Sequence, residues 1–227
     1  MSILYIDTET TGLNPYKDKV VLVGWAVDDS RVSVIEDFTL GIGEFKDNLV
    51  VGHNINFDLL FCHYALIHFV NCEYFDTQIY WHMIEPNQSS RLKDLGERLL
   101  GRKAVRISDF IQPKEKKGWV KIGYNTEKGF GYADPLVLKD YLKQDVELTR
   151  DLYKLAVKNG IPHYYKEIEQ PLIKIIFDME KRGMNVDLNK ANKLLETFKK
   201  EQILLEGYFT NLGVNTRSPK QVSKFIV

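Results

Sequence analysis

The first predicted strand, and the two acids that end it, constrain this chain more than any other feature. Residues 3–6 (ILYI) form a continuous apolar run, typical of a strand that is buried on both faces. Asp7 and Glu9 follow, and because side chains alternate along a strand, both should leave it on the same side. Two adjacent carboxylates repel each other, and a divalent cation such as Mg²⁺ or Mn²⁺ would relieve this repulsion. A solvated Asp/Thr/Gly turn is the alternative interpretation.

Composition narrows the class of protein without identifying it. The 227 residues suit one large domain or one domain with an appendage, and no apolar run approaches the length of a membrane span. The 31 Lys and Arg residues balance 31 Asp and Glu residues, so no overall basic field indicates a nucleic-acid partner. Cys62 and Cys72 predict no disulfide framework, and no signal-peptide pattern follows Met1, so we expect a cytoplasmic protein.

Hydrophobic periodicity predicts an α/β domain with a mixed sheet, followed by a helical extension. The predicted strands are residues 3–6, 20–27, 31–35, 49–52 and 73–75. The predicted helices are residues 44–48, 53–69, 76 onward, 91–100, 134–159, 161–182, 188–212 and 220–227. Ile161 and Pro162 mark a change of unit, so we predict domains at 1–160 and 161–227.

Residues 102–131 combine basic and aromatic side chains with several glycines. Such a stretch can follow a phosphate backbone and stack unpaired bases. A solvated surface hairpin whose aromatic residues pack onto the domain is the favoured interpretation, because long loops often have no further role.

Two further acids lie on predicted helices that follow the first strands. Asp145 falls on the apolar face of the predicted helix 134–159, one turn after Tyr141. A carboxylate on a buried face needs a partner, and an ion pair with Lys139 or Lys143 is the alternative to a metal. Asp58 lies in the first turn of its predicted helix, where the helix dipole alone favours an acid.

Taken together, three motifs resemble those of the DEDD superfamily of 3′–5′ exonucleases. They are residues 7–13 (DTETTGL), residues 52–58 (GHNINFD) and residues 141–145 (YLKQD), the last in the tyrosine (DEDDy) form. Any one of them alone would be a weak signal, but they occur in the order and at the separations of that family. Over residues 1–159 the resemblance implies a ribonuclease-H-like fold of the DnaQ type, a mixed β-sheet flanked by helices.

The rest of the chain resembles the start of the polymerase module of family A DNA polymerases. Residues 169–187 carry this resemblance, and residues 215–222 are similar to the motif that enters the thumb of that module. The palm, its catalytic aspartates and the fingers do not follow, so we expect no DNA synthesis by this chain. The remainder of the polymerase is expected in the same or a separate chain. An exonuclease motif starting near Met1 is similar to bacteriophage polymerases, which would place the protein in the host cytoplasm.

The resemblance also implies a chemistry. Two divalent cations, Mg²⁺ or Mn²⁺, would lie about 4 Å apart and clamp the attacking and leaving oxygens. Asp7 would bridge both cations, Glu9 and Asp145 would hold the one that carries the nucleophilic water, and Asp58 would serve the other. Tyr141 would orient the water. The residues implied to contact the terminal nucleotide are Thr8, Thr10, Leu13 and Asn54.

We therefore expect a metal-dependent, proofreading 3′–5′ DNA exonuclease that releases nucleoside 5′-monophosphates from single-stranded or frayed ends. One alternative is RNA trimming of the ribonuclease D kind, which shares the tyrosine motif but not the polymerase-like tail. The other is an inactive exonuclease fold kept as a scaffold, which the intact set of acids disfavours.

Overall fold

The computed structural model describes residues 1–36, 44–105, 111–114, 118–121 and 135–226. The chain divides into two compact units, Met1–Arg182 and Gly183–Val227. The first unit thus extends past the boundary predicted at residue 160, because helix α5 (Gln170–Arg182) packs onto it through the buried Ile173. The assignment of residues 161–227 to a polymerase module stays a prediction.

A five-stranded mixed sheet forms the centre of the first unit, with strand order β3-β2-β1-β5-β7. Its strands are β1 (Ser2–Thr10), β2 (Val20–Val27), β3 (Ser33–Ile35), β5 (Asn48–Gly52) and β7 (Glu73–Asp76). Strand β1 is antiparallel to β2 and parallel to β5, so it lies in the middle of the sheet. The predicted mixed sheet is confirmed, and the apolar run of the sequence is its central strand.

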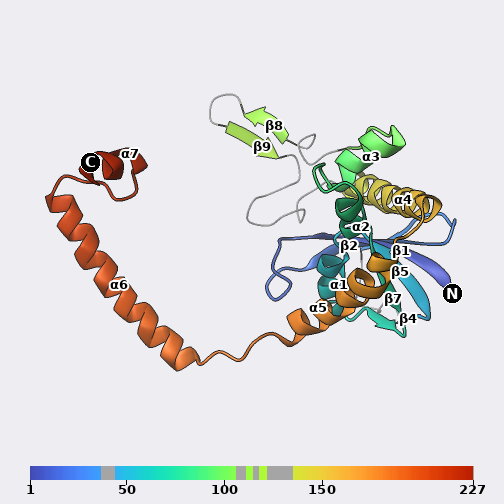
Figure 1. Cartoon of the computed structure of the whole chain (residues 1–227), viewed down its shortest axis with the longest axis horizontal. Coiled ribbons are helices and arrows are strands. Elements are labelled where there is room, and N and C mark those ends of the chain that lie inside the picture. The colour runs from blue at the N-terminus through green and yellow to red at the C-terminus, as the bar shows by residue number, and fades with distance from the viewer. Residues whose placement is uncertain (37–43, 106–110, 115–117, 122–134, 227) are drawn as a thin grey trace. The chain divides into compact units, whose positions relative to one another are not determined.

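Alternation along the strands divides the core between the two faces of the sheet. Tyr5, Val51 and Phe75 point to one face, where they pack with α2 (Thr77–Ile84), α3 (Leu92–Leu100) and α4 (Pro135–Asn159). Leu4, Val50 and Tyr74 point to the other face, which α1 (Ile55–Tyr64) and α5 cover. Figure 1 shows α3 and α4 on one side of the sheet and α1 and α5 on the other.

Two predicted elements were wrong. Residues 44–48 do not form a helix, because β4 (Glu44–Lys46) pairs in parallel with β6 (His68–Val70). The helix predicted to run to residue 69 ends at Tyr64 for the same reason, since Phe69 belongs to β6 and stacks on Phe45 with ring centroids 5.7 Å apart. Pairing between distant segments thus prevails over local helical periodicity.

The segment between α3 and α4 is described only in part. Strands β8 (Ile111–Lys114) and β9 (Gly118–Lys121) pair in antiparallel fashion. The interpretation of residues 102–131 as a solvated hairpin whose aromatic residues pack onto the domain stays a prediction. Arg102 lies next to α4, where it contacts Glu147 at 3.2 Å and pairs with Asp151. The prediction of a role for the other basic and aromatic residues falls largely outside the described residues.

The second unit consists of α6 (Leu188–Asn211) and α7 (Pro219–Ile226). Phe209 and Phe225 join the two helices, with ring centroids 5.9 Å apart, and Arg217 contacts Glu206 at 3.3 Å. Neither helix has a buried residue among those described. No described helix of the chain has the length and apolarity needed to cross a membrane.

A glycine in β2 allows α4 to approach the sheet beside the first strand. Gly24 is the register partner of Asp7. A Cβ atom at Gly24 would lie 2.8 Å from Leu142 Cγ and 3.1 Å from Val146 Cγ2, so the side chains of α4 fill the place where a side chain of β2 would be. Since Asp145 lies between Leu142 and Val146, this close contact brings the acid of α4 to the acids of β1.

We expect Gly24→Ala to destabilise the first unit by about 1–3 kcal/mol, because the added methyl group overpacks a buried contact. The displaced α4 should also lower the exonuclease activity that the sequence predicts, because Asp145 would move away from β1. Urea denaturation and a DNA degradation assay measure the two effects. Gly207→Ala is the matched control, since nothing lies within 4 Å of a Cβ atom there. Equal stability and activity of the two variants would contradict the role given to Gly24.

Candidate active site

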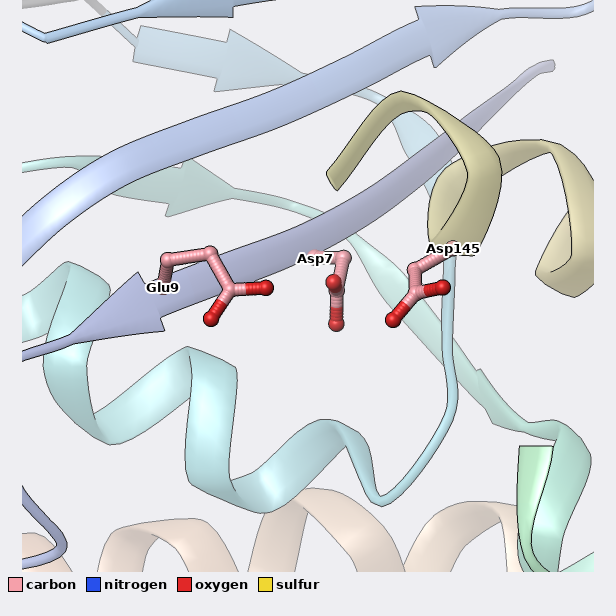
Figure 2. A group of neighbouring side chains, drawn as sticks. All are labelled: Asp7, Glu9 and Asp145. Carbon is pink, nitrogen blue, oxygen red and sulfur yellow. The ribbon is translucent and has the colours of Figure 1, made fainter. Parts of the chain in front are cut away.

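Three acids from two elements converge on one space beside β1. Asp7 and Glu9 leave β1 on the same side, and Asp145 reaches them from α4, so that one ligand oxygen from each lies within 4.8 Å of the others. Figure 2 shows Asp7 between Glu9 and Asp145, with the three carboxyl groups facing the same space. Glu9 and Asp145 are buried, and Asp7 is half-buried. The alternation of β1 and the apolar face of α4 thus bring together acids that are far apart in sequence.

Asp58 approaches the same region from α1 but lies outside this group of three. Asp58 is 2% exposed, and its carboxylate accepts a hydrogen bond from the Thr8 hydroxyl at 2.7 Å. Its charge interacts with that of Asp7, which helps to raise the pKa of Asp58 after the larger effect of burial. The structure therefore brings all four predicted acids into one electrostatic neighbourhood, with three of them in direct reach of a common ion.

Asp76 holds the start of α1, and the sequence analysis did not identify it. Its carboxylate accepts from the backbone N–H groups of Asn54 and Ile55 at the start of α1, at 3.1 and 2.9 Å. It also caps α2 by accepting from Gln78 and Ile79. An Asp before a helix is a recognisable cap of that helix, but its second role depends on β5 and β7 being neighbours. Asp76 thereby fixes the helix that carries Asp58.

Burial raises the free energy of the ionised carboxylates in this cluster, and so raises their pKa values. It raises the pKa of Asp7 to about 7, although the Lys93 charge and the backbone N–H of Thr8 oppose the shift. Burial and the charge of Asp7 raise the pKa of Glu9 well above its usual range, and Lys93 again opposes this. Acids whose pKa is raised in this way ionise near neutral pH only where positive charge lies nearby, and a bound cation reverses such shifts.

Lys93, at the start of α3, supplies positive charge to the cluster, and it was not predicted. Its ammonium group forms an ion pair with Asp145 and lies 4.2 Å from the centroid of the Tyr141 ring. The predicted alternative partners of Asp145 were wrong, because Lys139 pairs with Glu36 and Lys143 contacts Asp140. Helical spacing within α4 indicated only lysines of the same helix, whereas the partner comes from a neighbouring one.

The residues predicted to contact a nucleotide lie on β1, in the loop that follows it and at the start of α1. The Thr8 and Thr10 hydroxyl groups donate to Asp58 and to the Gly12 carbonyl, so both protons are used within the protein. Leu13 is 82% exposed in the loop after β1, as a residue that contacts a ligand would be. Asn54 is exposed at the start of α1. Their contacts with a substrate stay predictions.

The donor set fits a divalent cation with hard oxygen ligands. Carboxylate oxygens of Asp7, Glu9 and Asp145 converge within 4.8 Å, and among the residues that the structure describes no sulfur or imidazole donor joins them. Carboxylate oxygens suit Mg²⁺ or Mn²⁺ rather than the softer metals. The burial of the cluster adds to the fit, because removing acids from water is tolerated where a cation compensates their charge.

Comparison with known families gives the class of this chain. The family model described as 3′–5′ exonuclease matches residues 1–156. The chain therefore belongs to the 3′–5′ exonuclease family, in the branch found in DNA polymerase I, and the predicted ribonuclease-H-like fold and enzyme class are confirmed.

Its relatives include two bacterial DNA polymerases I. That of Borreliella burgdorferi is 23% identical, with 97% of this chain and 25% of the relative aligned. That of Synechocystis sp. is 25% identical, with 97% of this chain and 24% of the relative aligned. The chain thus spans about a quarter of the length of these relatives.

Two solved structures share its fold. The POL domain of Pol1 from M. smegmatis, in complex with DNA primer-template and dNTP, aligns with a TM-score of 0.62 at 15% identity, over 97% of this chain and 36% of that one. Brucella melitensis NrnC bound to pGG aligns with a TM-score of 0.52 at 18% identity, over 78% of this chain and 79% of that one.

His53 lies beside the site as a packing residue. Its Nδ1 atom is 2.9 Å from the Thr77 hydroxyl oxygen, which itself donates to the Gly52 carbonyl at 3.0 Å. The hydroxyl therefore accepts from His53 Nδ1–H. Burial lowers the pKa of His53 to about 4, a hydrogen bond with the Ser90 backbone opposes this shift, and the Lys93 charge adds to it. His53 thus stays neutral in the folded protein well below the usual pKa of histidine.

We expect His53 to make the fold sensitive to acid. As pH falls from about 6.5 towards 4, His53 binds a proton in the unfolded chain but stays neutral in the folded chain. The free energy of unfolding therefore falls by about 1–2 kcal/mol by pH 5. Urea denaturation at pH 7.5, 6 and 5 should show a smaller loss for His53→Asn than for the unmodified chain. His163→Asn is the control, since the His163 side chain is 82% exposed. Identical losses in all three proteins would contradict the assignment.

Proposed function

We propose that this chain is the metal-dependent, proofreading 3′–5′ DNA exonuclease of a DNA polymerase I-like protein. One observation carries the proposal, namely the convergence of Asp7, Glu9 and Asp145 within 4.8 Å in a chain of the exonuclease family. The substrate would be a DNA 3′ end, single-stranded or frayed, and the product a nucleoside 5′-monophosphate.

Asp7, Glu9 and Asp145 would hold one cation, and Asp58 would serve a second cation together with Asp7. Bound in this way, two Mg²⁺ ions supply a nucleophilic water near neutral pH and neutralise the charge that develops on the phosphate. The fold would hold these four acids in place. The contact of Gly24 with α4 and the capping of α1 by Asp76 position the two helices that carry Asp145 and Asp58.

Three other side chains would orient the reactants. Tyr141, one helical turn before Asp145, would hydrogen-bond the attacking water and direct it to the phosphate. The exposed side chain of Leu13 would lie against the terminal base, and Asn54 would contact the terminal nucleotide. A mismatched end would be degraded before a paired one, because its base costs less free energy to unstack and unpair.

The relatives support DNA as the substrate and a polymerase as the partner. Both are DNA polymerases I, and the alignment covers 97% of this chain, which includes α6 and α7. We propose that residues 161–227 lead into a polymerase module, present in the same or a separate chain.

RNA is the second candidate substrate. The likeness to NrnC, whose structure was solved with pGG bound, concerns the fold and extends over 78% of this chain. The tyrosine form of the third motif is also that of ribonuclease D-like enzymes. Neither point depends on the helical extension, which the alignment to DNA polymerase I includes.

We expect a labelled single-stranded DNA with a free 3′ end to be shortened stepwise in Mg²⁺ and to stay intact in chelator. Asp145→Asn should lower the rate by at least about a hundredfold, because it removes a charged metal ligand while keeping the shape of the side chain. Asp140→Asn is the matched control on the same helix, where the side chain is 80% exposed. Gel electrophoresis of the products measures the rates.

A 3′-blocked DNA and an RNA of the same sequence complete the experiment. Degradation of the blocked DNA would contradict an exonuclease that acts from 3′ ends. Faster degradation of RNA than of DNA would favour the ribonuclease interpretation. If a folded chain shortens none of these substrates in Mg²⁺ or Mn²⁺, the proposed function is wrong.

A further inference from the structure

The burial of Lys93 requires an explanation beyond ordinary surface electrostatics. Its side chain is 11% exposed, and its partner Asp145 is 8% exposed. Lysine side chains are rarely this buried, because an ammonium group loses much favourable hydration on leaving water. The attraction between Lys93 and the surrounding carboxylates must therefore offset the hydration that the ammonium group loses.

The packing of α3 against α4 positions Lys93 beside the acid cluster. A Cβ atom at Gly96 would lie 2.9 Å from Leu148 Cδ2, which shows how closely α3 approaches α4 one turn after Lys93. Leu95 is fully buried in the same contact region. Beyond the end of α3, Arg102 contacts Glu147 and pairs with Asp151 of α4. The helix that carries Lys93 is thus held against α4 at its middle and beyond its C-terminal end.

The positive charge of the Lys93 ammonium group acts on the same carboxylates that a metal ion would bind. The ammonium group pairs with Asp145 directly, lies over the Tyr141 ring at 4.2 Å, and its charge acts on Asp7 and Glu9. A divalent cation held by these three acids would attract the same oxygen atoms. The lysine and the metal cannot both neutralise Asp145 fully, because each takes up the same negative charge.

We propose that Lys93 is a positioning residue that holds Asp145 towards Asp7 and Glu9 while the site is metal-free, and yields this position to the metal ion. The inference rests on the proposed function, because it assumes that Asp7, Glu9 and Asp145 are the metal ligands. On this proposal, Lys93 and the metal ion compete for the Asp145 carboxylate. The lysine keeps the acids assembled in the absence of metal, at the cost of weaker metal binding.

Titration calorimetry with Mn²⁺ alone at pH 8 tests the proposal on the full chain. Lys93→Met, which keeps the length and apolar stem of the side chain, should bind Mn²⁺ about tenfold more tightly than the unmodified chain, because no internal cation competes. In chelator the same variant should unfold at a lower urea concentration, and Mn²⁺ should restore more stability to it than to the unmodified chain. Lys93→Arg keeps the charge and should bind Mn²⁺ no more tightly than the unmodified chain.

Lys143→Met is the matched control, since Lys143 contacts Asp140 on the exposed side of α4. Lys93→Gln takes the place of Lys93→Met if the latter does not fold, because its amide can still hydrogen-bond Asp145 without a charge. If the unmodified chain binds Mn²⁺ through Asp145 and the neutral variants bind it equally or more weakly, the inference about Lys93 is wrong and the proposed function stands. If the unmodified chain binds no Mn²⁺, the proposed function and the inference are both wrong.

Discussion

The concentration of negative charge at the centre of the sheet is the constraint on which the rest of this structure depends. Asp7, Glu9 and Asp145 bring their oxygens within 4.8 Å, and burial raises the pKa of Asp7 and Glu9. Such a cluster would disperse or stay protonated unless the surrounding fold held it together and a positive charge compensated it. Lys93 supplies part of that charge through its ion pair with Asp145. In the proposed enzyme, metal ions supply it.

The fold holds the acids together with close contacts that do not involve the acids directly. Gly24 lets Leu142 and Val146 of α4 pack onto the sheet next to Asp7. Asp76 links the starts of α1 and α2 with one carboxylate, and so fixes the helix of Asp58. Each contact joins elements that are distant in the sequence, and each sets the position of one acid relative to β1. The site is therefore a product of the packing of α1 and α4 against the central strand.

Much of this arrangement could be predicted from local patterns, and the rest could not for physical reasons. Alternation along residues 3–9 predicted that Asp7 and Glu9 share a side, and helical spacing placed Asp145 on the buried face of α4. The same spacing failed at residues 44–48 and 65–69, where pairing of β4 with β6 prevailed. It also failed for the partner of Asp145, because Lys93 reaches it from another helix. A pattern within one element carries no information about the side chains that a second element adds.

The central claim is that these acids form one metal-binding site, and anomalous scattering from crystals soaked in Mn²⁺ tests it most directly. The account predicts an anomalous difference peak about 2.1 Å from carboxylate oxygens of Asp7, Glu9 and Asp145, with the Lys93 ammonium moved away from Asp145. A peak elsewhere on the molecule, or an unchanged ion pair between Lys93 and Asp145 with no peak beside it, would contradict the account.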